Sequence, residues 1–185
     1  RTTHEGMDLL LGGSRRLHFI DTPGHARHHD CIWDEATRTW FTGDTFGISY
    51  REFDVPGRGV WIFPPVVPTQ FDPTAWRESI ARLVAFAPDR VCVPHFRPLG
   101  EVRRLARALL HMLDAVVAIG LAQRDAPDRH AALKRELGAL YAARLREHGV
   151  AASVPAQELL AIDIELNAQG LGQWLDREAK SEYPS

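Results

Sequence analysis

The 185-residue chain has the composition of a folded globular protein, with 45% apolar residues and a net charge of -2 at pH 7. A charge this close to neutral does not provide the broad positive surface by which proteins bind nucleic acid or anionic membranes. No run of about 18 apolar residues predicts a membrane-spanning helix. We therefore expect neither nucleic acid nor a membrane among its partners.

The only two cysteines, Cys31 and Cys92, fall in segments that predict strands. A thiol in such a place usually behaves as a small buried apolar group, so no disulfide framework is expected. Free cysteines favour a reducing compartment, and we expect a cytoplasmic protein.

The first part of the chain predicts two hairpins. Residues 7–11 and 16–20 read as strands joined by a Gly-Gly-Ser turn. Residues 30–34 and 39–42 form the second pair, which is rich in aromatic and β-branched side chains. Paired strands in this order predict a sheet with turns at its edges.

A sharp turn is predicted where the first hairpin ends, at Thr22-Pro23-Gly24-His25. Pro23 keeps Thr22 extended, and Gly24 can adopt backbone angles that other residues avoid. The turn therefore places His25 at the rim of the sheet. The second hairpin ends in the same manner, with Gly43-Asp44.

Residues 45–70 contain many prolines and glycines but no long periodic pattern, which predicts an extended loop of the kind that often carries function. Aromatic side chains in and beside this loop either line an apolar pocket or pack in the core, and the sequence leaves both open. They are Phe46, Tyr50, Phe53, Trp61 and Phe71.

A helix and a strand follow the loop. Asp72-Pro73 favours a helix start, and apolar residues recur at helical spacing until Pro88. A short strand over 90–93 then leads to His95. Strands and helices in alternation, with histidines and an aspartate at strand ends, predict a layered α/β fold.

From Leu99 the pattern becomes almost purely helical, with three apolar stripes over 102–116, 133–141 and 159–174. Breaks are expected near 126–127, at 149–155 and at 170–172. We assign 1–98 to the α/β part and 99–185 to a helical extension. Its stripes are expected to cover the site, the α/β part or a second subunit in a homodimer.

Three motifs occur in a fixed order at strand ends, namely Thr-Pro-Gly-His at 22–25, Thr-Gly-Asp at 42–44 and Pro-His at 94–95. This order resembles the third and fourth metal-binding motifs and the last histidine of the metallo-β-lactamase fold, over about residues 5 to 100. The resemblance implies the C-terminal half of an αββα sandwich, followed here by the all-helical extension. The family's first motif, His-x-His-x-Asp-His, is absent from the sequence. Since the chain also begins at Arg1, we expect a missing N-terminal half of the same domain as its partner.

The resemblance also implies a metal site. In the family the residue at His25 binds one metal, the one at Asp44 bridges two, and the one at His95 binds the second. We expect two divalent ions, zinc first, with iron or manganese open because imidazole and carboxylate suit all three. Asp44 is then the catalytic candidate, and a metal-activated water attacks a small-molecule ester, thioester, lactone or phosphoester.

Several further residues are candidates for the surroundings of the metal. His28 and His29 are adjacent and must point in different directions, so we expect one beside the site and the other at the surface. Asp30 either hydrogen-bonds a ligating imidazole or lies in solvent. Phe46 and Tyr50 are the pocket candidates from the loop.

Other chemistries have little support in the sequence. It contains no Gly-x-Ser-x-Gly elbow and no glycine-rich phosphate loop, and neither cysteine has a catalytic context. The three expected ligands fall short of the roughly three or four that each zinc ion uses, so the isolated chain is expected to be nearly inactive. The alternative is a binding or oligomerisation module that kept the sandwich and lost the metal site.

Overall fold

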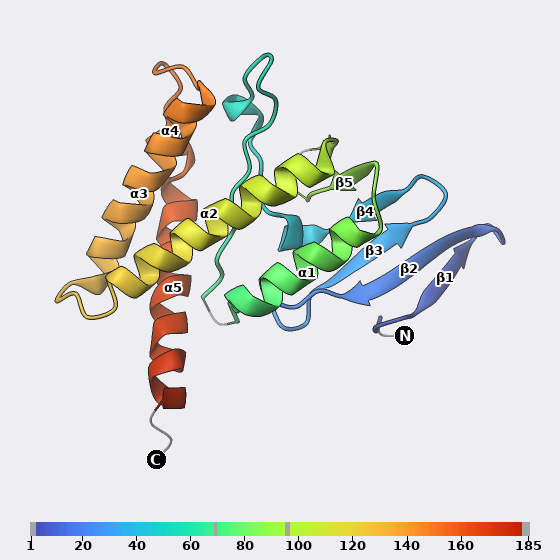
Figure 1. Ribbon diagram of the computed structural model, residues 1–185, viewed down its shortest axis with the longest axis horizontal. Helices are drawn as coiled ribbons and strands as arrows, with labels where there is room; N and C mark the ends of the chain where they lie inside the picture. Colours follow the sequence, from blue (N-terminus) through green and yellow to red (C-terminus); the bar gives the residue numbers. More distant parts are fainter. Residues whose placement is uncertain (1–2, 69, 95–96, 183–185) are drawn as a thin grey trace.

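The computed structural model describes residues 3–68, 70–94 and 97–182, and residues 181 and 182 are described by their backbone only. A six-stranded sheet lies on one side of the molecule and a group of long helices on the other (Figure 1). The strands are β1 (Asp8–Leu11), β2 (Arg15–Asp21), β3 (Asp30–Asp34), β4 (Thr39–Phe41), β5 (Arg90–Cys92) and β6 (Pro98–Leu99). This is the mixed α/β plan that the sequence predicts.

The strands follow one another in the sheet in chain order, and only β4 and β5 pair in parallel. A parallel pair needs a crossover connection, and α1 (Pro73–Ala85) supplies it. The helix begins where expected, because the Asp72 side chain accepts hydrogen bonds from the backbone N–H groups of Thr74 and Ala75, both at 3.0 Å.

One face of the sheet is packed against α1, which lies over it in Figure 1. Trp33, Trp40 and Val91 sit side by side on adjacent strands and are all buried. The Trp40 indole N–H donates to the carbonyl of Leu83 in α1 at 3.0 Å. The aromatic residues that predict the second hairpin therefore also fix the helix on the sheet.

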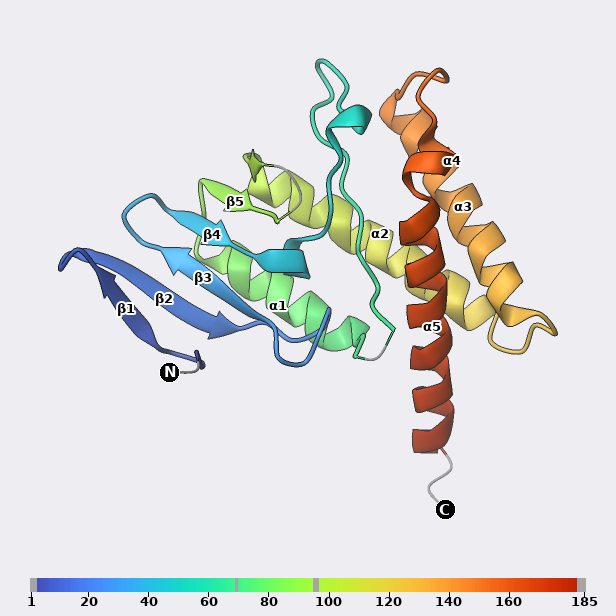
Figure 2. The ribbon, with the colours of Figure 1, turned by 180° about the vertical axis from the view of Figure 1, so that it is seen from behind.

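The opposite face carries a second apolar row. Successive side chains of a strand point to opposite faces, so Ile32, Phe41 and Cys92, each next to a residue of the buried row, belong to this face. Leu9 and Phe41 are 40% and 43% exposed. Seen from behind, no helix of the part that the structure describes covers β2, β3 or β4 (Figure 2).

The second half of the chain is helical, as expected. It consists of α2 (Val102–Ala122), α3 (Arg129–His148), α4 (Ala156–Leu159) and α5 (Ala161–Glu182). The break predicted at 170–172 is wrong, because α5 continues through Gly170 and Gly172. A glycine within a helix costs only about 1 kcal/mol relative to alanine, which the packing of α5 offsets.

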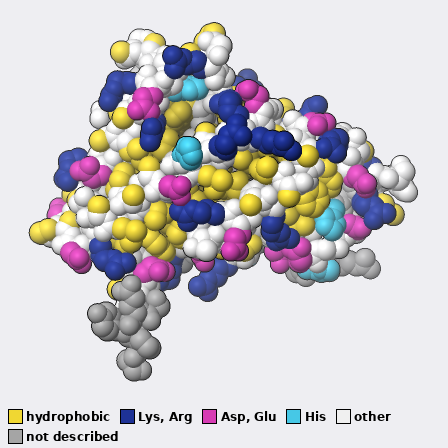
Figure 3. Space-filling model, in the orientation of Figure 1, with side chains coloured by type: hydrophobic (Ala, Val, Ile, Leu, Met, Phe, Trp, Pro, Cys, Tyr) yellow, Lys and Arg dark blue, Asp and Glu magenta, His cyan; other side chains and the backbone are white. Residues whose placement is uncertain are grey.

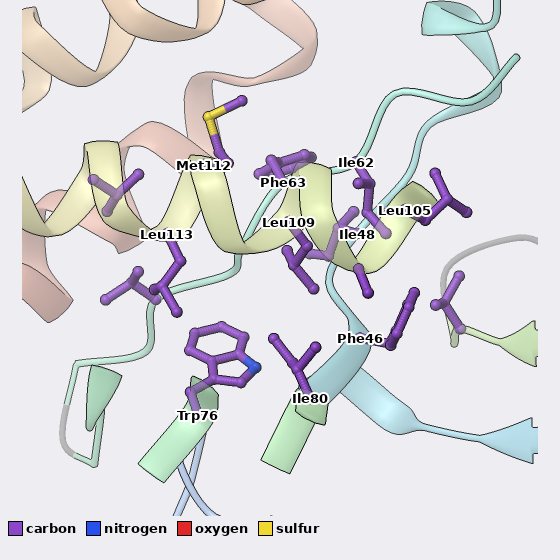
Figure 4. Close-up of a cluster of buried hydrophobic side chains, with 14 of the residues drawn as sticks. Phe46, Ile48, Ile62, Phe63, Trp76, Ile80, Leu105, Leu109, Met112 and Leu113 are labelled. Carbon is purple, nitrogen blue, oxygen red and sulfur yellow. The ribbon is translucent and has the colours of Figure 1, made fainter. Parts of the chain in front are cut away.

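The sheet half and the helices share one hydrophobic core. Figure 4 shows Leu109 and Leu113 of α2 on the side that faces Trp76 and Ile80 of α1. By length and hydropathy α2 would also suit a membrane span, which the sequence reading misses. Its buried residues pack on α1, α3 and α5.

The loop after β4 differs from the extended segment predicted. It contains two short 3₁₀ helices, η1 (Gly43–Phe46) and η2 (Arg51–Phe53). Of the two roles left open for its aromatic residues, core packing holds for Phe46, Phe53, Trp61 and Phe71, which are all buried. These side chains fill the space between the sheet and the helical half.

Charged side chains of both signs are interspersed over the face shown in Figure 3. At the start of α2, Arg104 contacts Glu101 at 2.9 Å. On the neighbouring helix Arg77 contacts Asp114 of α2 at 2.6 Å. Exposed pairs of this kind contribute little to stability, about 0–1 kcal/mol each.

Candidate metal centre

The turn that carries His25 is held directly against the start of α1. Gly24 has φ +133°, and a Cβ built on it would lie 2.3–2.4 Å from the backbone and Cβ of Trp76. The Asp72 N–H donates to the Gly24 carbonyl at 2.8 Å, and the Ser79 hydroxyl donates to the Pro23 carbonyl at 2.7 Å. Only glycine fits this close approach, which explains why the turn sequence has Gly before His.

The imidazole of His25 is held by a hydrogen bond at Nδ1 and faces Asp44 with Nε2. Nδ1 lies 2.9 Å from the carbonyl oxygen of Pro65, which can only accept, so Nδ1 carries the proton. Nε2 then presents its lone pair toward Asp44 Oδ2, 3.4 Å away. Burial lowers the pKa of His25, opposed in part by the Pro65 hydrogen bond and by Asp44, and keeps the ring neutral at pH 7.

Two electron-pair donors that face each other at 3.4 Å suit a shared cation. Two ligands about 2.0–2.1 Å from one ion in tetrahedral geometry lie about 3.3 Å apart. An N–H of the same imidazole anchored on a backbone carbonyl is the usual support of a metal-binding histidine. The residues present therefore fit a divalent metal ion.

His29 supports the Asp44 turn instead of facing the metal position. Its Nε2 accepts the backbone N–H of Asp44 at 3.2 Å, and its Nδ1 lies 3.1 Å from the Thr45 hydroxyl. Gly43, with φ +46°, makes room for the ring, because a Cβ there would lie 2.4 Å from it. Burial and the nearby His25 lower the pKa of His29, which keeps Nε2 an acceptor.

Trp76 joins the two motif turns. Its indole N–H donates to the carbonyl of Thr45 at 2.6 Å, and its ring lies edge-on to His25 at 5.7 Å between centroids. In the sequence, Trp76 is one of the apolar residues at helical spacing after Asp72-Pro73. Its place in the first turn of α1, which packs on the turn with His25, is the feature that could have indicated this role.

The hydroxyl groups of Thr22 and Thr45 lie 3.2 Å apart beneath the site, and both residues are fully buried. The Cys31 thiol joins them, with Sγ 3.1 Å from the Thr22 hydroxyl. Burial raises the pKa of Cys31 to about 12, so the thiol stays protonated. The cysteine is a structural neighbour of the site.

We expect iodoacetamide at pH 8 to modify Cys92 and to leave Cys31 unmodified in the folded chain. Cys31 is buried, whereas Cys92 is partly exposed, and thiolate is the reacting form. Peptide mapping by mass spectrometry after a timed reaction measures both. Full alkylation in urea is the control, and equal rates in the folded chain would contradict this assignment.

The remaining candidates are His28, Asp30 and His95. His28 is exposed, with Nδ1 3.2 Å from the side-chain oxygen of Gln70. Asp30 begins β3 opposite Asp21. His95 lies outside the residues that the structure describes.

Phe46 and Tyr50, the two pocket candidates from the loop, make their described contacts with the core and the helical half. Phe46, the last residue of η1, is buried in the core that it shares with residues of α2. Tyr50 donates its hydroxyl to Asp163 of α5 at 3.0 Å. Its ring packs against Phe63 and Phe53, so Tyr50 connects the loop to the helical half.

Within the described ranges, no group of three or more His, Cys, Asp or Glu residues could hold a metal ion. His25 and Asp44 therefore supply a two-residue donor pair, held by Pro65 and His29. The sequence does not reveal the role of Pro65, because every residue has a backbone carbonyl and the residue type does not show which one accepts a hydrogen bond. The proline-rich run at 64–68, which fixes backbone angles, is the available signal.

The sheet and the helices on one of its faces define a layered α/β fold, with an imidazole and a carboxylate facing each other at strand ends. The sequence profile of the metallo-beta-lactamase superfamily matches residues 2–95, slightly more than half of the chain. The chain belongs to this superfamily, which confirms the resemblance of its motifs. No curated protein sequence matches it.

Solved structures with the same fold cover the helical extension as well. A metallo-beta-lactamase family protein from Thermus thermophilus is similar to 95% of the chain, with a TM-score of 0.57 and 20% identity. A beta-lactamase domain protein from Burkholderia ambifaria covers 97%, with a TM-score of 0.56 and 18% identity. An archaeal superfamily protein from Sulfolobus tokodaii covers 90%, with a TM-score of 0.53 and 22% identity.

The chain spans about half the length of these solved structures, 48%, 47% and 49% in the same order. Identities this low support the fold alone. The expectation of a partial metallo-β-lactamase sandwich followed by a helical extension agrees with these matches and with the observed elements.

Proposed function

We propose that the chain supplies part of the metal centre of a metal-dependent hydrolase. The observation that carries this proposal is the pair formed by neutral His25 and Asp44, with Nε2 and Oδ2 3.4 Å apart and the imidazole anchored on Pro65. Superfamily membership of residues 2–95 supports it. The retained pair also argues against a module that has lost its metal site.

The rest of the centre would come from the missing half of the same domain. The sequence lacks the first metal-binding motif, and the chain spans about half of the solved structures it resembles. The exposed apolar row with Ile32 and Phe41 on the sheet suits a second sheet that packs face to face. We propose that this second sheet brings the remaining ligands for two divalent ions, zinc first.

In such a centre, bound divalent ions lower the pKa of water toward about 7 and polarise the bond to be cleaved. His25 offers Nε2 as a neutral ligand because its Nδ1–H is held by Pro65. Asp44 contributes negative charge and two oxygen atoms, and His29 fixes the backbone N–H of Asp44. Trp76 excludes water from one side of the imidazole. The substrate would be an ester, thioester, lactone or phosphoester.

Zinc titration of the chain by calorimetry tests the donor pair. We expect His25→Ala and Asp44→Ala each to weaken zinc binding at least tenfold, since even residues that only support a ligand cost about 10–100-fold. His28→Ala is the matched control, because this neighbouring histidine is exposed and bound to Gln70. Equal affinities in the three variants and the unaltered chain would refute the assignment.

The same variants test hydrolysis once the other half is present. The chain alone should be nearly inactive, because two described donors do not complete a catalytic metal site. Co-expression with an N-terminal half that carries His-x-His-x-Asp-His should restore zinc-dependent cleavage of at least one substrate in an ester, thioester, lactone and phosphodiester panel. High activity of the chain alone would contradict the proposal.

A further inference from the structure

A buried asparagine of the helical extension binds the backbone on both sides of Pro65. Asn167 of α5 is 1% exposed, and its Oδ1 accepts the N–H of Val66 at 2.7 Å. Its Nδ2 donates to the carbonyl of Pro64 at 3.1 Å and to the hydroxyl of Tyr141 at 2.5 Å. An N–H group only donates and a carbonyl only accepts, so these contacts fix the orientation of the amide.

The peptide group between Pro65 and Val66 connects this asparagine to the candidate metal centre. A peptide group is planar, and in the trans form found here its N–H and its C=O point in opposite directions. The N–H end binds Asn167, whereas the C=O end accepts the Nδ1–H of His25 at 2.9 Å. One rigid group therefore transmits the position of α5 to the imidazole.

The loop offers few other ways to fix this peptide group. Pro64 and Pro65 have no backbone N–H, so Val66 is the first donor of the segment. Three residues after Asn167, Gly170 lets α5 approach closely, since a Cβ there would lie 2.7 Å from the Val66 carbonyl oxygen and 2.9 Å from that of Val67. Asn167 and Gly170 thus hold the loop on the same side of the helix.

We propose that Asn167 is a positioning residue for His25, which it orients through the Val66–Pro65 peptide group. The helical extension then acts on the metal centre by fixing one tautomer and one direction of this imidazole. The orientation of His25 is a property of the chain itself, whereas its consequence for metal binding rests on the proposed function. The two parts are therefore tested by separate measurements.

The first measurement is ¹⁵N NMR of the histidine side chains in the metal-free chain. In the unaltered chain we expect His25 as a single Nδ1–H tautomer with slow exchange of that proton. In Asn167→Ala we expect mixed tautomers and exchange at least tenfold faster. Tyr141→Phe, which keeps both contacts of Asn167 to the loop, and Gln169→Ala on the exposed side of α5 should leave the signal unchanged.

An unchanged His25 signal in folded Asn167→Ala would overturn the proposal. Circular dichroism shows whether the variant folds. If it does not, Asn167→Gln, which keeps the amide but moves it by one methylene, replaces it with the same expected loss. An Asn167→Gln variant that retains the slow Nδ1–H proton would also overturn the proposal.

The second measurement is zinc affinity by calorimetry on the same four proteins. Loss of a group that orients a metal ligand typically costs about 10–100-fold in affinity, and we expect this for Asn167→Ala only. If the unaltered chain binds no zinc through His25 while the NMR change occurs, the proposed function fails and the positioning role stands. If zinc binds through His25 equally in all four proteins and the NMR signal is unchanged, the positioning role fails alone.

Discussion

Replacing Trp76 by alanine is expected to cost about 3–5 kcal/mol of folding stability, as loss of a fully buried tryptophan usually does. The residue is fully buried, packs edge-on to His25 and Phe71, and donates its indole N–H to Thr45 at 2.6 Å. Its removal therefore leaves a cavity and an unpaired carbonyl under both motif turns. The turns that carry His25 and Asp44 should lose their common support.

Trp40 offers a matched control. It is equally buried, and its indole N–H also donates to a backbone carbonyl, that of Leu83 at 3.0 Å. Trp40→Phe and Trp76→Phe should each lose about 1–2 kcal/mol, measured by urea unfolding, because both lose one buried hydrogen bond and some volume. Only Trp76→Phe should also weaken zinc binding. An equal effect of the two on zinc affinity would show that stability alone, and not the contact with the turns, controls the site.

The sequence predicts best those features that local chemistry determines. The strands of both hairpins, the start of α1 at Asp72 and the turn at Gly24 all depend on residues within a few positions of one another. Propensity, capping and backbone freedom therefore suffice to place them. His25 and Asp44 come to the same edge of the sheet because strand order follows chain order: the turn with His25 leads into β3, and the antiparallel neighbour β4 ends just before Asp44.

Contacts between residues that are far apart in the sequence could not be predicted. The carbonyl that fixes His25 belongs to Pro65, forty residues later, and the asparagine that fixes this carbonyl lies a further hundred residues along. Neither interaction depends on a local pattern. The same limit applies to Phe46. An aromatic side chain suits a pocket and a core equally, and only the packing against α2 shows that Phe46 belongs to the core.

The choice between His28 and His29 shows how a small feature decides a site. The sequence indicates that adjacent histidines diverge but not which one turns inward. Gly43 decides, because the absence of a side chain leaves space for the His29 ring. His28 is left at the surface beside Gln70. The inward position of His29 therefore depends on a glycine fourteen residues later in the chain.

The second large effect is expected for Gly24→Ala, which should lose about 3 kcal/mol or more. The new Cβ would overlap the Trp76 backbone at 2.3–2.4 Å, and the backbone angle φ +133° is itself unfavourable for alanine. Overpacking typically costs about 1–3 kcal/mol and an unfavourable backbone region about the same again. Because the new Cβ would meet helix backbone, either the turn or the start of α1 must move. The hydrogen bond from the Asp72 N–H to the Gly24 carbonyl is then lost.

Gly13→Ala separates the two causes. Gly13 also has a positive φ, +81°, but a Cβ there would meet nothing within 4 Å. This variant should lose about 1 kcal/mol from backbone strain alone. For a chain of this size about 1 kcal/mol shifts the melting temperature by about 2–4 °C, so thermal unfolding should show a drop of about 6–12 °C for Gly24→Ala and about a third of that for Gly13→Ala. Equal drops would mean that backbone angle, and not the contact with Trp76, makes glycine necessary before His25.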